Sequence, residues 1–393
     1  MKIGVIGIGK LGLCTAEVLK KYGHDVIGMD INKKIVKKIN SGICPTDETD
    51  LKEYMEKYPI RATTDIRELI HSDISFIITP TPSLPDGSFD DKYVKEAVFS
   101  LLDYLPRERY HLFNIVSTVM PGTCREIERE ISKYRTRKSF GIAYNPEFIA
   151  QGSILKDFQN PDFVLMGGNI RALDILTKVY SFIPQEKLKR MSLENAEIAK
   201  LALNSFVTMK INYGNLIANM CENIKNGDCD IVSDAIGTDS RIGNKCLKGG
   251  TSYGGPCFPR DNVALFKFCE DNGIEASILR STDVMNENHN LRLYMKVRDM
   301  IPMGGTVAIL GLPYKPNTSI LTESAGVKLQ ERLRNDYKIQ IDNVKGADLA
   351  VVMLPQTHLN ISKMRKKVVI DCWRTLENEI KKQGGKYHAI GKG

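Results

Sequence analysis

Short apolar runs alternate with longer amphipathic stretches along the first third of the chain. Short runs of β-branched and aliphatic residues predict buried strands at residues 2–6, 25–30, 74–78 and 114–116. The amphipathic stretches between them predict a helix at residues 11–22 and another that contains residues 36–39. Strand and helix in alternation predict a parallel sheet with helices on both faces.

The middle of the chain has a different pattern. Residues 194–223 contain no proline and one glycine, and apolar side chains recur at Ile198, Leu201, Phe206 and Ile211. This pattern predicts a single long helix. A second α/β unit begins near residue 304, with strands predicted at residues 306–310, 349–353 and 367–370. We therefore expect an α/β protein with two Rossmann-like, doubly wound domains joined by a long central helix and a helical connector.

The composition is that of a folded, mildly basic protein. Of 393 residues, 42% are hydrophobic and 26% are charged, which excludes a disordered chain. The net charge of +8 is spread in short clusters, which favours solvated faces over a nucleic-acid site and is compatible with small acidic substrates. No apolar run approaches the ~20 residues that cross a bilayer. We expect neither nucleic acid nor a membrane as partner.

Nine cysteines are scattered along the chain, and no two have the two-residue spacing of a zinc or redox site. An odd number of dispersed thiols in a chain of this length is typical of a reducing compartment. We therefore expect a cytoplasmic protein, and we predict no metal site.

A glycine triplet follows the first predicted strand and opens the first predicted helix. Gly7 permits a tight turn, Gly9 lets the backbone approach a pyrophosphate, and Gly12 allows helix and strand to pack closely. The helix N-terminus favours the anion. Asp30 can accept both ribose hydroxyls and would repel a 2′-phosphate, which favours NAD over NADP. A glycine turn without a ligand is the alternative. The predicted cofactor contacts here are Gly7, Gly9, Lys10, Leu11, Gly12 and Asp30.

A second glycine-rich stretch, residues 249–261, holds a thiol among charges. Cys257 lies four residues before Asp261, and Arg260 between them can favour the nucleophilic thiolate. A lone cysteine is more often a small buried side chain, but the neighbouring glycines, proline and charges argue against a plain core position. We expect a reactive cysteine.

Motifs along nearly the whole chain resemble the nucleotide-sugar dehydrogenase family, which includes the UDP-glucose and GDP-mannose dehydrogenases. In sequence order they are Gly7-x-Gly9-x-x-Gly12, Pro80-Thr81-Pro82, Ser117-Thr118-Val119-x-x-Gly122-Thr123, Asn145-Pro146-Glu147-Phe148, Lys200-Leu-Ala-Leu-Asn204, Arg241-Ile-Gly243, Gly254-Gly-Pro-Cys257-Phe-Pro-Arg-Asp261 and Tyr314-Lys315. The resemblance implies an NAD-binding domain at residues 1–190. It also implies a helical connector and dimerisation region with the catalytic cysteine loop at 191–300, and a nucleotide-sugar-binding domain at 301–393.

The family oxidises the C6 alcohol of a nucleotide sugar to a carboxylate with two NAD, so the resemblance implies NAD as cofactor. Cys257 would add to the aldehyde that forms first, giving a thiohemiacetal and then a thioester that water hydrolyses. Lys200 and Asn204, four residues apart on one helix face, would stabilise the oxyanion at C6. A solvated surface position is the alternative for Lys200.

Two carboxylates handle protons if the resemblance holds. Asp261 would act directly or through a water that Thr118 also holds, and Glu147 would assist hydrolysis of the thioester. The alternative for Glu147 is a solvent-facing acid in the turn that Asn145 and Pro146 mark.

The resemblance implies the remaining contacts as well. The substrate-binding set is Glu147, Phe148, Ile149, Lys200, Asn204, Leu247, Lys248, Gly250, Tyr253, Gly254 and Lys315. The further cofactor contacts are Thr81, Thr118, Gln151 and Arg260. Arg241 would reach the neighbouring subunit's site in a homodimer, with an intrachain salt bridge as the alternative.

The sequence departs from the family pattern at Gln151, Phe163 and Thr322, where members often carry a glutamate, an arginine and an arginine. These departures bear on NAD affinity and domain closure. UDP-glucose is the favoured substrate, with GDP-mannose or another UDP-sugar as alternatives. A catalytically impaired relative that still binds NAD and nucleotide sugar, and a two-electron alcohol dehydrogenase in which Cys257 is structural, are the other hypotheses.

Overall fold

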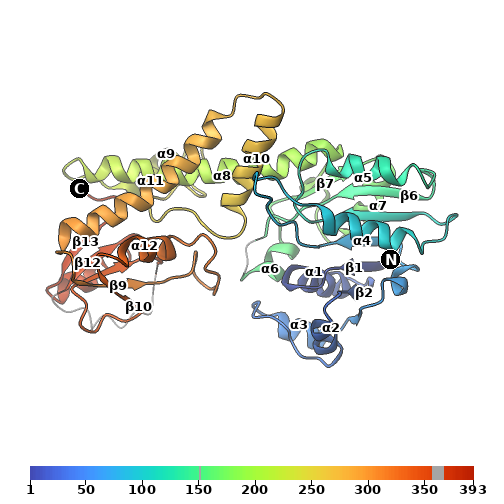
Figure 1. The fold of residues 1–393 in the computed structure, drawn as a ribbon, viewed down its shortest axis with the longest axis horizontal. Coiled ribbons are helices and arrows are strands. Elements are labelled where there is room, and N and C mark those ends of the chain that lie inside the picture. Colours follow the sequence, from blue (N-terminus) through green and yellow to red (C-terminus); the bar gives the residue numbers. More distant parts are fainter. Residues whose placement is uncertain (150–151, 356–366) are drawn as a thin grey trace. The chain divides into compact units, whose positions relative to one another are not determined.

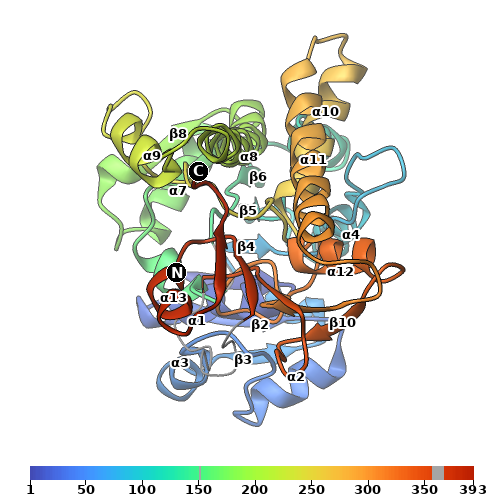
Figure 2. The same cartoon turned by 90° about the vertical axis from the view of Figure 1, so that its left-hand side faces the viewer.

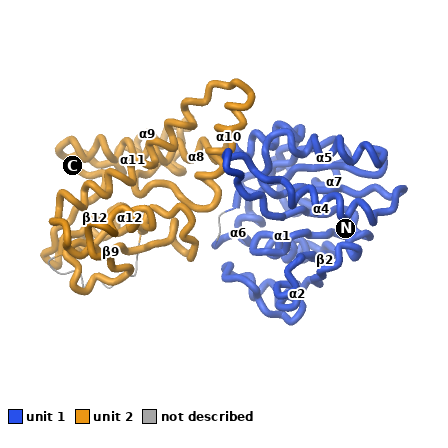
Figure 3. The backbone as a smooth tube through the Cα atoms, viewed as in Figure 1, with its two compact units in different colours: residues 1–201 blue, residues 202–393 orange. Residues whose placement is uncertain are grey.

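The computed structural model describes residues 1–149, 152–355 and 367–393. The chain forms two compact units, Met1–Leu201 and Ala202–Gly393 (Figure 3). The boundary between the units falls inside one long helix.

An eight-stranded sheet forms the centre of unit 1 (Figure 1). Its strands are β1 (Lys2–Ile6), β2 (Asp25–Met29), β3 (Arg61–Thr63), β4 (Ile74–Ile77), β5 (His111–Ile115), β6 (Phe140–Tyr144), β7 (Val164–Gly168) and β8 (Leu188–Met191). Their order is β3-β2-β1-β4-β5-β6-β7-β8, and among these strands only β6 and β7 pair antiparallel. The order reverses between β1 and β4, which is the doubly wound arrangement whose ligands bind beyond the carboxyl ends of the strands.

Helices cover both faces of this sheet. They are α1 (Lys10–Lys21), α2 (Lys33–Asn40), α3 (Leu51–Lys57), η1 (Ile66–Leu69), α4 (Lys92–Leu102), α5 (Thr123–Ile131), α6 (Ile154–Gln159), α7 (Ile170–Val179) and η2 (Gln185–Lys187). The alternation along β1 explains the two layers, because Ile3 and Val5 join the core under α1 while Ile6 joins the core under α4 and α5. The predicted sheet with helices on both faces is confirmed, and it is parallel except where β6 pairs with β7.

The helix α8 (Leu193–Glu222) is one uninterrupted helix of 30 residues, as the sequence predicts. At 1.5 Å per residue it is about 45 Å long. In unit 1, the carboxylate of Glu197 accepts hydrogen bonds from the backbone N–H groups of Gly122 and Cys124, at 2.6 and 2.8 Å. These bonds satisfy N–H groups at the start of α5 and so fix the loop before it.

Unit 2 contains a five-stranded sheet, and every pair of neighbouring strands in its described residues is parallel. Its strands are β9 (Thr306–Leu310), β10 (Lys338–Ile341), β11 (Leu349–Val352), β12 (Val368–Asp371) and β13 (Lys386–Ala389), in the order β10-β9-β11-β12-β13. Along β9, Val307 and Ile309 pack on one face and Ala308 and Leu310 on the other. This sheet is also doubly wound, so the predicted second Rossmann-like domain is confirmed.

The remaining helices of unit 2 are α9 (Cys229–Gly237), α10 (Phe258–Asp271), α11 (Ser277–Met300), α12 (Ala325–Leu333) and α13 (Glu377–Lys382). Figure 2 shows α10, α11 and α12 following one another along one side of the unit, and α11 contacts both of the others. Side chains of α8, α11 and α12 share one core with β9 and β11, whereas α13 packs on the opposite face of the sheet. No helix in the described residues is long and apolar enough to cross a membrane.

Candidate functional site

The turn between β1 and α1 has room for a phosphate group at one glycine only. A Cβ on Gly7, whose φ is +90°, would lie 2.4 Å from the carbonyl oxygen of Ile78, and a Cβ on Gly12 would lie 1.9 Å from that of Gly7. At Gly9 a Cβ would meet no heavy atom of the described residues within 4 Å. The two outer glycines are therefore required by packing, and the middle one leaves open space for a ligand.

The start of α1 suits the pyrophosphate of a dinucleotide. Gly9 precedes the helix and offers no side chain to cap its N–H groups, and the first turn carries no acidic residue. Lys10 lies in that turn, with its ammonium 2.5 Å from Asp47, followed by Leu11. Asp30 follows β2 and accepts a hydrogen bond from the N–H of Asn32 at 2.8 Å. The residues present therefore fit NAD at the carboxyl ends of β1 and β2.

Two threonines lie beyond the next strands of the sheet. The Thr81 hydroxyl, after β4, donates to the carbonyl oxygen of Thr118, after β5, at 2.7 Å. The Ser117 hydroxyl donates to the carbonyl oxygen of Thr79, also at 2.7 Å. These bonds hold together the loops that follow β4 and β5, so both predicted threonines lie at the carboxyl edge of the sheet.

The turn after β6 carries Glu147, whose carboxyl group is buried and has a raised pKa. Burial raises its pKa to about 7, against the opposing charge of Lys200 and a hydrogen bond from Tyr180. The Lys200 ammonium donates to the backbone carbonyl of Glu147 at 2.5 Å and lies 4.5 Å from the ring centroid of Phe148. Unit 1 therefore brings Glu147, Phe148 and Lys200 together, and a pKa near 7 suits a general base.

The sequence did not reveal Tyr180, the residue that supports this turn. Tyr180 is buried after α7, and its one hydroxyl hydrogen is shared between Glu147 and the side-chain oxygen of Asn145, which lies 2.7 Å from the hydroxyl. The Asn145 amide in turn donates to the carbonyl oxygen of Leu165 at 2.9 Å. Tyr180 lies 33 residues from Glu147, so no local pattern pointed to it.

Two of the departures from the family pattern bear on this region. Phe163 packs its ring against Phe148, with 4.9 Å between the ring centroids, so an aromatic contact stands where an arginine is frequent. Gln151 was predicted to contact the cofactor, and it lies outside the described residues. Ile149, the neighbouring predicted substrate contact, packs in part against the core of unit 1.

In unit 2, Cys257 is exposed at the N-terminus of α10. The dipole of this 14-residue helix favours negative charge at the thiol, because its N–H groups point toward Cys257. One turn into the helix, the Asp261 carboxylate accepts a hydrogen bond from the Asn204 amide at 2.6 Å. Arg260 lies 3.6 Å from the same carboxylate. Cys257, Asp261 and Asn204 thus lie on two adjoining helices, α8 and α10.

The segment Leu247–Gly254, here called the glycine loop, is held by a row of amides that the sequence did not reveal. On α8, Asn215 accepts from the N–H of Gly250 at 2.8 Å. On α11, Asn286 bonds both the N–H and the carbonyl of Tyr253, at 2.9 and 3.0 Å, and Asn290 accepts from Ser252. Asparagine is unfavourable in the interior of a helix, and residues four apart lie on one helix face. The spacing of Asn286 and Asn290 is therefore the one signal in the sequence that could have indicated this row of amides.

Gly254, the last residue of the glycine loop, and Gly255 after it contact the segment after β9. Gly255, with φ at +87°, donates to the carbonyl oxygen of Thr322 at 3.0 Å, and a Cβ there would lie 2.6 Å from the ring of Tyr314. At Gly254 a Cβ would lie 2.1 Å from the carbonyl oxygen of Glu323. Thr322 therefore supports the residues just before Cys257 through its backbone carbonyl. An arginine at this position would offer the same carbonyl, so this contact does not depend on the side chain.

The other substrate contacts predicted in unit 2 have different surroundings. Leu247 is buried and Lys248 is exposed, and the Lys315 ammonium lies 5.7 Å from the ring centroid of Tyr314. The Arg241 side chain is 86% exposed and forms an ion pair with Asp239 at 2.6 Å. The intrachain salt bridge that the sequence left open is thus present, but exposed pairs contribute little and are easily exchanged.

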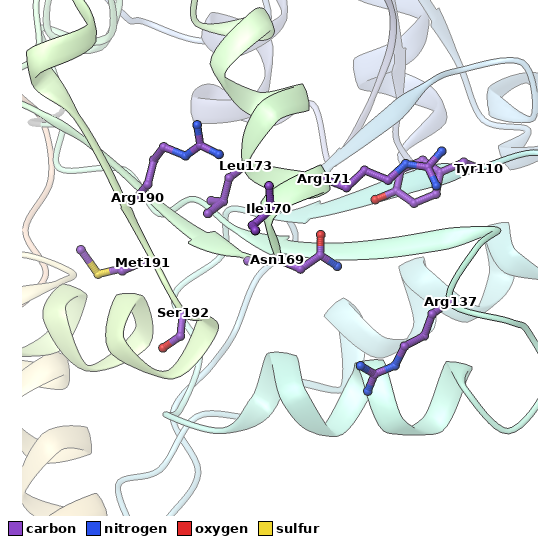
Figure 4. Close-up of a pocket in the computed structure, with 10 residues that line it drawn as sticks. Tyr110, Arg137, Asn169, Ile170, Arg171, Leu173, Arg190, Met191 and Ser192 are labelled. Carbon is purple, nitrogen blue, oxygen red and sulfur yellow. The ribbon is translucent and has the colours of Figure 1, made fainter.

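A depression of about 640 Å³ on unit 1 contains none of the predicted residues (Figure 4). It lies around the end of β7 and the start of α7, and is lined by residues that include Tyr110, Arg171 and Arg190. The Arg171 guanidinium stacks 3.5 Å from the Tyr110 ring centroid, and Arg190 pairs with Asp174. The chemistry predicted for unit 1 therefore lies elsewhere.

The thiols form no disulfide. None of the nine cysteines, all of which lie in the described residues, is cross-linked. Of the nine, Cys246 and Cys257 are exposed, and the others are buried or half-buried.

Comparisons with known proteins identify the family of the chain. Residues 1–184 match the NAD binding domain of the UDP-glucose/GDP-mannose dehydrogenase family, and residues 194–288 match its central domain. The chain belongs to this family of NAD-dependent dehydrogenases, and its cofactor is NAD. A UDP-glucose 6-dehydrogenase of Haloferax volcanii is 34% identical over 85% of this chain and 80% of its own length. One of Rickettsia conorii is 31% identical over 100% of this chain and 99% of its own length.

A solved structure shows the same likeness. A UDP-glucose dehydrogenase from Pyrobaculum islandicum superposes with a TM-score of 0.88 and 26% identity, over 100% of this chain and 98% of that one. A UDP-D-ManNAc dehydrogenase from Pyrococcus horikoshii shares the fold, with a TM-score of 0.86 at 24% identity over the full length of both chains.

Proposed function

We propose that the protein oxidises the C6 alcohol of UDP-glucose to the carboxylate of UDP-glucuronate in two NAD-dependent steps. The observation that carries this proposal is the thiol at the N-terminus of α10, with Asp261 and Asn204 hydrogen-bonded one turn away. A simple alcohol dehydrogenase needs no nucleophile, whereas a second oxidation to the acid level uses one. The names of the relatives from Haloferax and Rickettsia support UDP-glucose as the substrate.

The proposed reaction consumes one water and two NAD, and it yields the carboxylate, two NADH and three protons. Bound NAD accepts one hydride in each oxidation. Asp261, directly or through a water that Thr118 holds, takes the hydroxyl proton in the first step, and Lys200 and Asn204 stabilise the oxygen of the resulting aldehyde. The Cys257 thiolate adds to the aldehyde carbon, so a C–S bond forms and the carbonyl oxygen takes a proton.

The second oxidation converts this thiohemiacetal to a thioester and releases the hydroxyl proton. Glu147 then takes a proton from the attacking water, and collapse of the tetrahedral adduct breaks the C–S bond and returns the thiolate of Cys257. A carboxyl group with a pKa near 7 can accept that proton at neutral pH, which matches the surroundings of Glu147.

The test is the ratio of NADH formed to sugar consumed, measured with UDP-glucose, GDP-mannose and UDP-N-acetylhexosamines. Two NADH per UDP-glucose supports the proposal. One NADH per sugar would show a two-electron alcohol dehydrogenase, and turnover of another nucleotide sugar alone would move the proposal to that substrate. Binding of NAD and sugar without turnover would identify a catalytically impaired relative.

We also propose that the protein is a homodimer and that it acts in the cytoplasm. One face of α8 exposes apolar side chains at a spacing of seven residues, Phe206, Tyr213 and Met220, with exposed fractions of 58%, 52% and 48%. Side chains seven residues apart lie on one helix face, and an apolar face of this size is typical of a contact surface. A second copy of the chain is the occupant that we propose. We further propose that the chain divides into three parts, at residues 1–190, 191–300 and 301–393. We also propose that the protein works in a reducing environment, which keeps the Cys257 thiol reduced.

The trans role proposed for Arg241 can be tested by mixing two inactive variants, Arg241→Ala and Cys257→Ala. A mixed dimer has one site with an intact thiol, and that site receives Arg241 from the other subunit if the residue acts in trans. Mixing should then restore about a quarter of the wild-type activity, because half of the dimers are mixed and each has one working site. If Arg241 acts within its own subunit, mixing restores none.

A further inference from the structure

The turn after β12 is fixed by one buried carboxylate. Asp371 is fully buried, and its two oxygens accept hydrogen bonds from the backbone N–H groups of Trp373, Arg374 and Leu376, at 2.9, 3.0 and 2.9 Å. Arg374 has a φ of +60°, in the left-handed region that a non-glycine residue seldom adopts. The side chains of Trp373 and Arg374 are therefore presented by a turn with little freedom.

The guanidinium of Arg374 uses all five of its N–H groups inside unit 2. Two bond the Asp230 carboxylate, at 2.7 and 2.9 Å, and two bond the carbonyl oxygens of Cys372 and Ile390, at 3.2 and 2.7 Å. The fifth bonds the carbonyl oxygen of Gly249 at 2.8 Å. The side chain is 3% exposed. A guanidinium has five donors, so none is left for a bound phosphate, and Arg374 can act on a ligand only through the glycine loop.

The peptide unit between Gly249 and Gly250 is thereby held at both ends. Arg374 bonds its carbonyl oxygen, and Asn215 accepts from its N–H at 2.8 Å. The next carbonyl, that of Gly250, lies 2.7 Å from the Nε2 atom of His289. A carbonyl oxygen can only accept, so His289 donates from Nε2, and burial lowers the pKa of its ring. Two successive peptide units therefore cannot rotate without breaking buried hydrogen bonds.

Trp373 contacts the same loop. A Cβ on Gly250 would lie 2.8 Å from the six-membered ring of Trp373, and the indole N–H donates to the carbonyl oxygen of Met353 at 2.8 Å. Trp373 is the one tryptophan of the sequence. The indole ring is thus a single fluorescent group in direct contact with the glycine loop.

We propose that Arg374 is a positioning residue for the nucleotide part of the substrate, which it serves by fixing the Gly249–Gly250 peptide in the orientation that receives the ligand. This proposal rests on the proposed function and on the substrate contacts that the family resemblance implies within the glycine loop. Loss of the Arg374 bond frees a peptide that the bound ligand must then order again, so the cost falls on substrate affinity.

The test compares Arg374→Gln and Arg374→Lys with two controls. The expected result for both variants is a KM for UDP-glucose raised about 10- to 30-fold, with kcat and the KM for NAD within about twofold of the wild type. The surface variant Arg334→Gln, which changes an exposed arginine of the same unit, should match the wild type. Asp230→Asn keeps a hydrogen-bonding partner for Arg374 and removes the charge, so it should lower Tm and leave the KM for UDP-glucose nearly unchanged.

Fluorescence gives a second readout that does not need turnover. Titration of the wild type with UDP alone should change the Trp373 emission, and the apparent Kd for UDP should rise in the Arg374 variants by the same factor as KM. A wild-type KM in folded Arg374→Gln, or equal losses of kcat, both KM values and Tm, would overturn the proposal. If the variants do not fold, a Trp373 emission that UDP leaves unchanged in the wild type overturns it. Failure of the wild type to form two NADH from UDP-glucose would instead refute the proposed function.

Discussion

The substitution Tyr180→Phe should shift the pH dependence of the oxidation to higher pH. The Tyr180 hydroxyl shares its hydrogen between Asn145 and Glu147, and it donates more strongly to Glu147 when that residue is ionised; the pKa of Glu147 is raised to about 7 mainly by burial. A hydrogen bond to a charged group contributes about 1.5–3 kcal/mol. At about 1.36 kcal/mol per pH unit, its loss raises the pKa of Glu147 by about 1–2 units.

The magnitude follows from the fraction of Glu147 that is ionised. At pH 7 this fraction falls from about one half to between one tenth and one hundredth, so kcat should fall roughly 5- to 50-fold if Glu147 is the base in hydrolysis. Above about pH 9.5 the carboxylate forms again, and kcat should return toward that of the wild type.

The assay is kcat at saturating NAD and UDP-glucose, measured from about pH 6 to about pH 10. Tyr110→Phe is the matched control, because its hydroxyl is also buried in unit 1, lies beside Gly141 at the start of β6 whereas Glu147 follows β6, and has no hydrogen-bond partner among the described residues. It should leave the profile unchanged. An unshifted profile for Tyr180→Phe, or an equal loss of kcat at every pH, would refute the assignment of Glu147 as a base controlled by Tyr180.

Three further predictions concern other parts of the chain. Gly12→Ala places a Cβ 1.9 Å from the carbonyl oxygen of Gly7, so the KM for NAD should rise at least about tenfold while UDP still changes the tryptophan fluorescence. Cys257→Ser should accumulate an intermediate or turn over very slowly, and near-normal production of two NADH would exclude the thioester. Glu17 is buried on α1, its carboxyl oxygens have no partner among the described residues, and burial raises its pKa from 4.5 to about 8. Between these values the unfolded chain binds fewer protons than the native one, so stability falls as pH rises and then levels off. The free energy of unfolding of Glu17→Gln, measured in urea, should therefore fall less than that of the wild type between about pH 5 and about pH 9, and the difference should be a few kcal/mol.

The sequence predicted the elements whose pattern is local. The strand at residues 306–310 and the helix at 194–223 were located to within one residue, because buried strands and long amphipathic helices leave a continuous signal. The sequence also predicted the motif around Cys257 and the turn at Gly7, because the residues of each motif lie within a few consecutive positions.

The residues that support these motifs were not predictable in this way. Arg374 reaches Gly249 across 125 residues of sequence, and Asn215 reaches Gly250 across 35. Such pairs meet only when separate strands and helices of the fold come together, and no periodicity within one segment records the partner. Asn286 and Asn290 are a partial exception, because polar residues that disfavour helix recur on one face of α11.

The distribution of the nine thiols allows the proposed active sites in a sample to be counted. Burial raises the pKa of the Cys14, Cys124 and Cys372 thiols well above the usual range, so alkylating reagents that need a thiolate leave them unmodified in the folded protein. Cys246 and Cys257 are the two exposed thiols. With Cys246 and the half-buried Cys44 and Cys269 replaced by serine, a brief treatment with iodoacetamide becomes a titrant for Cys257. The label incorporated per chain then equals the fraction of competent sites in any preparation.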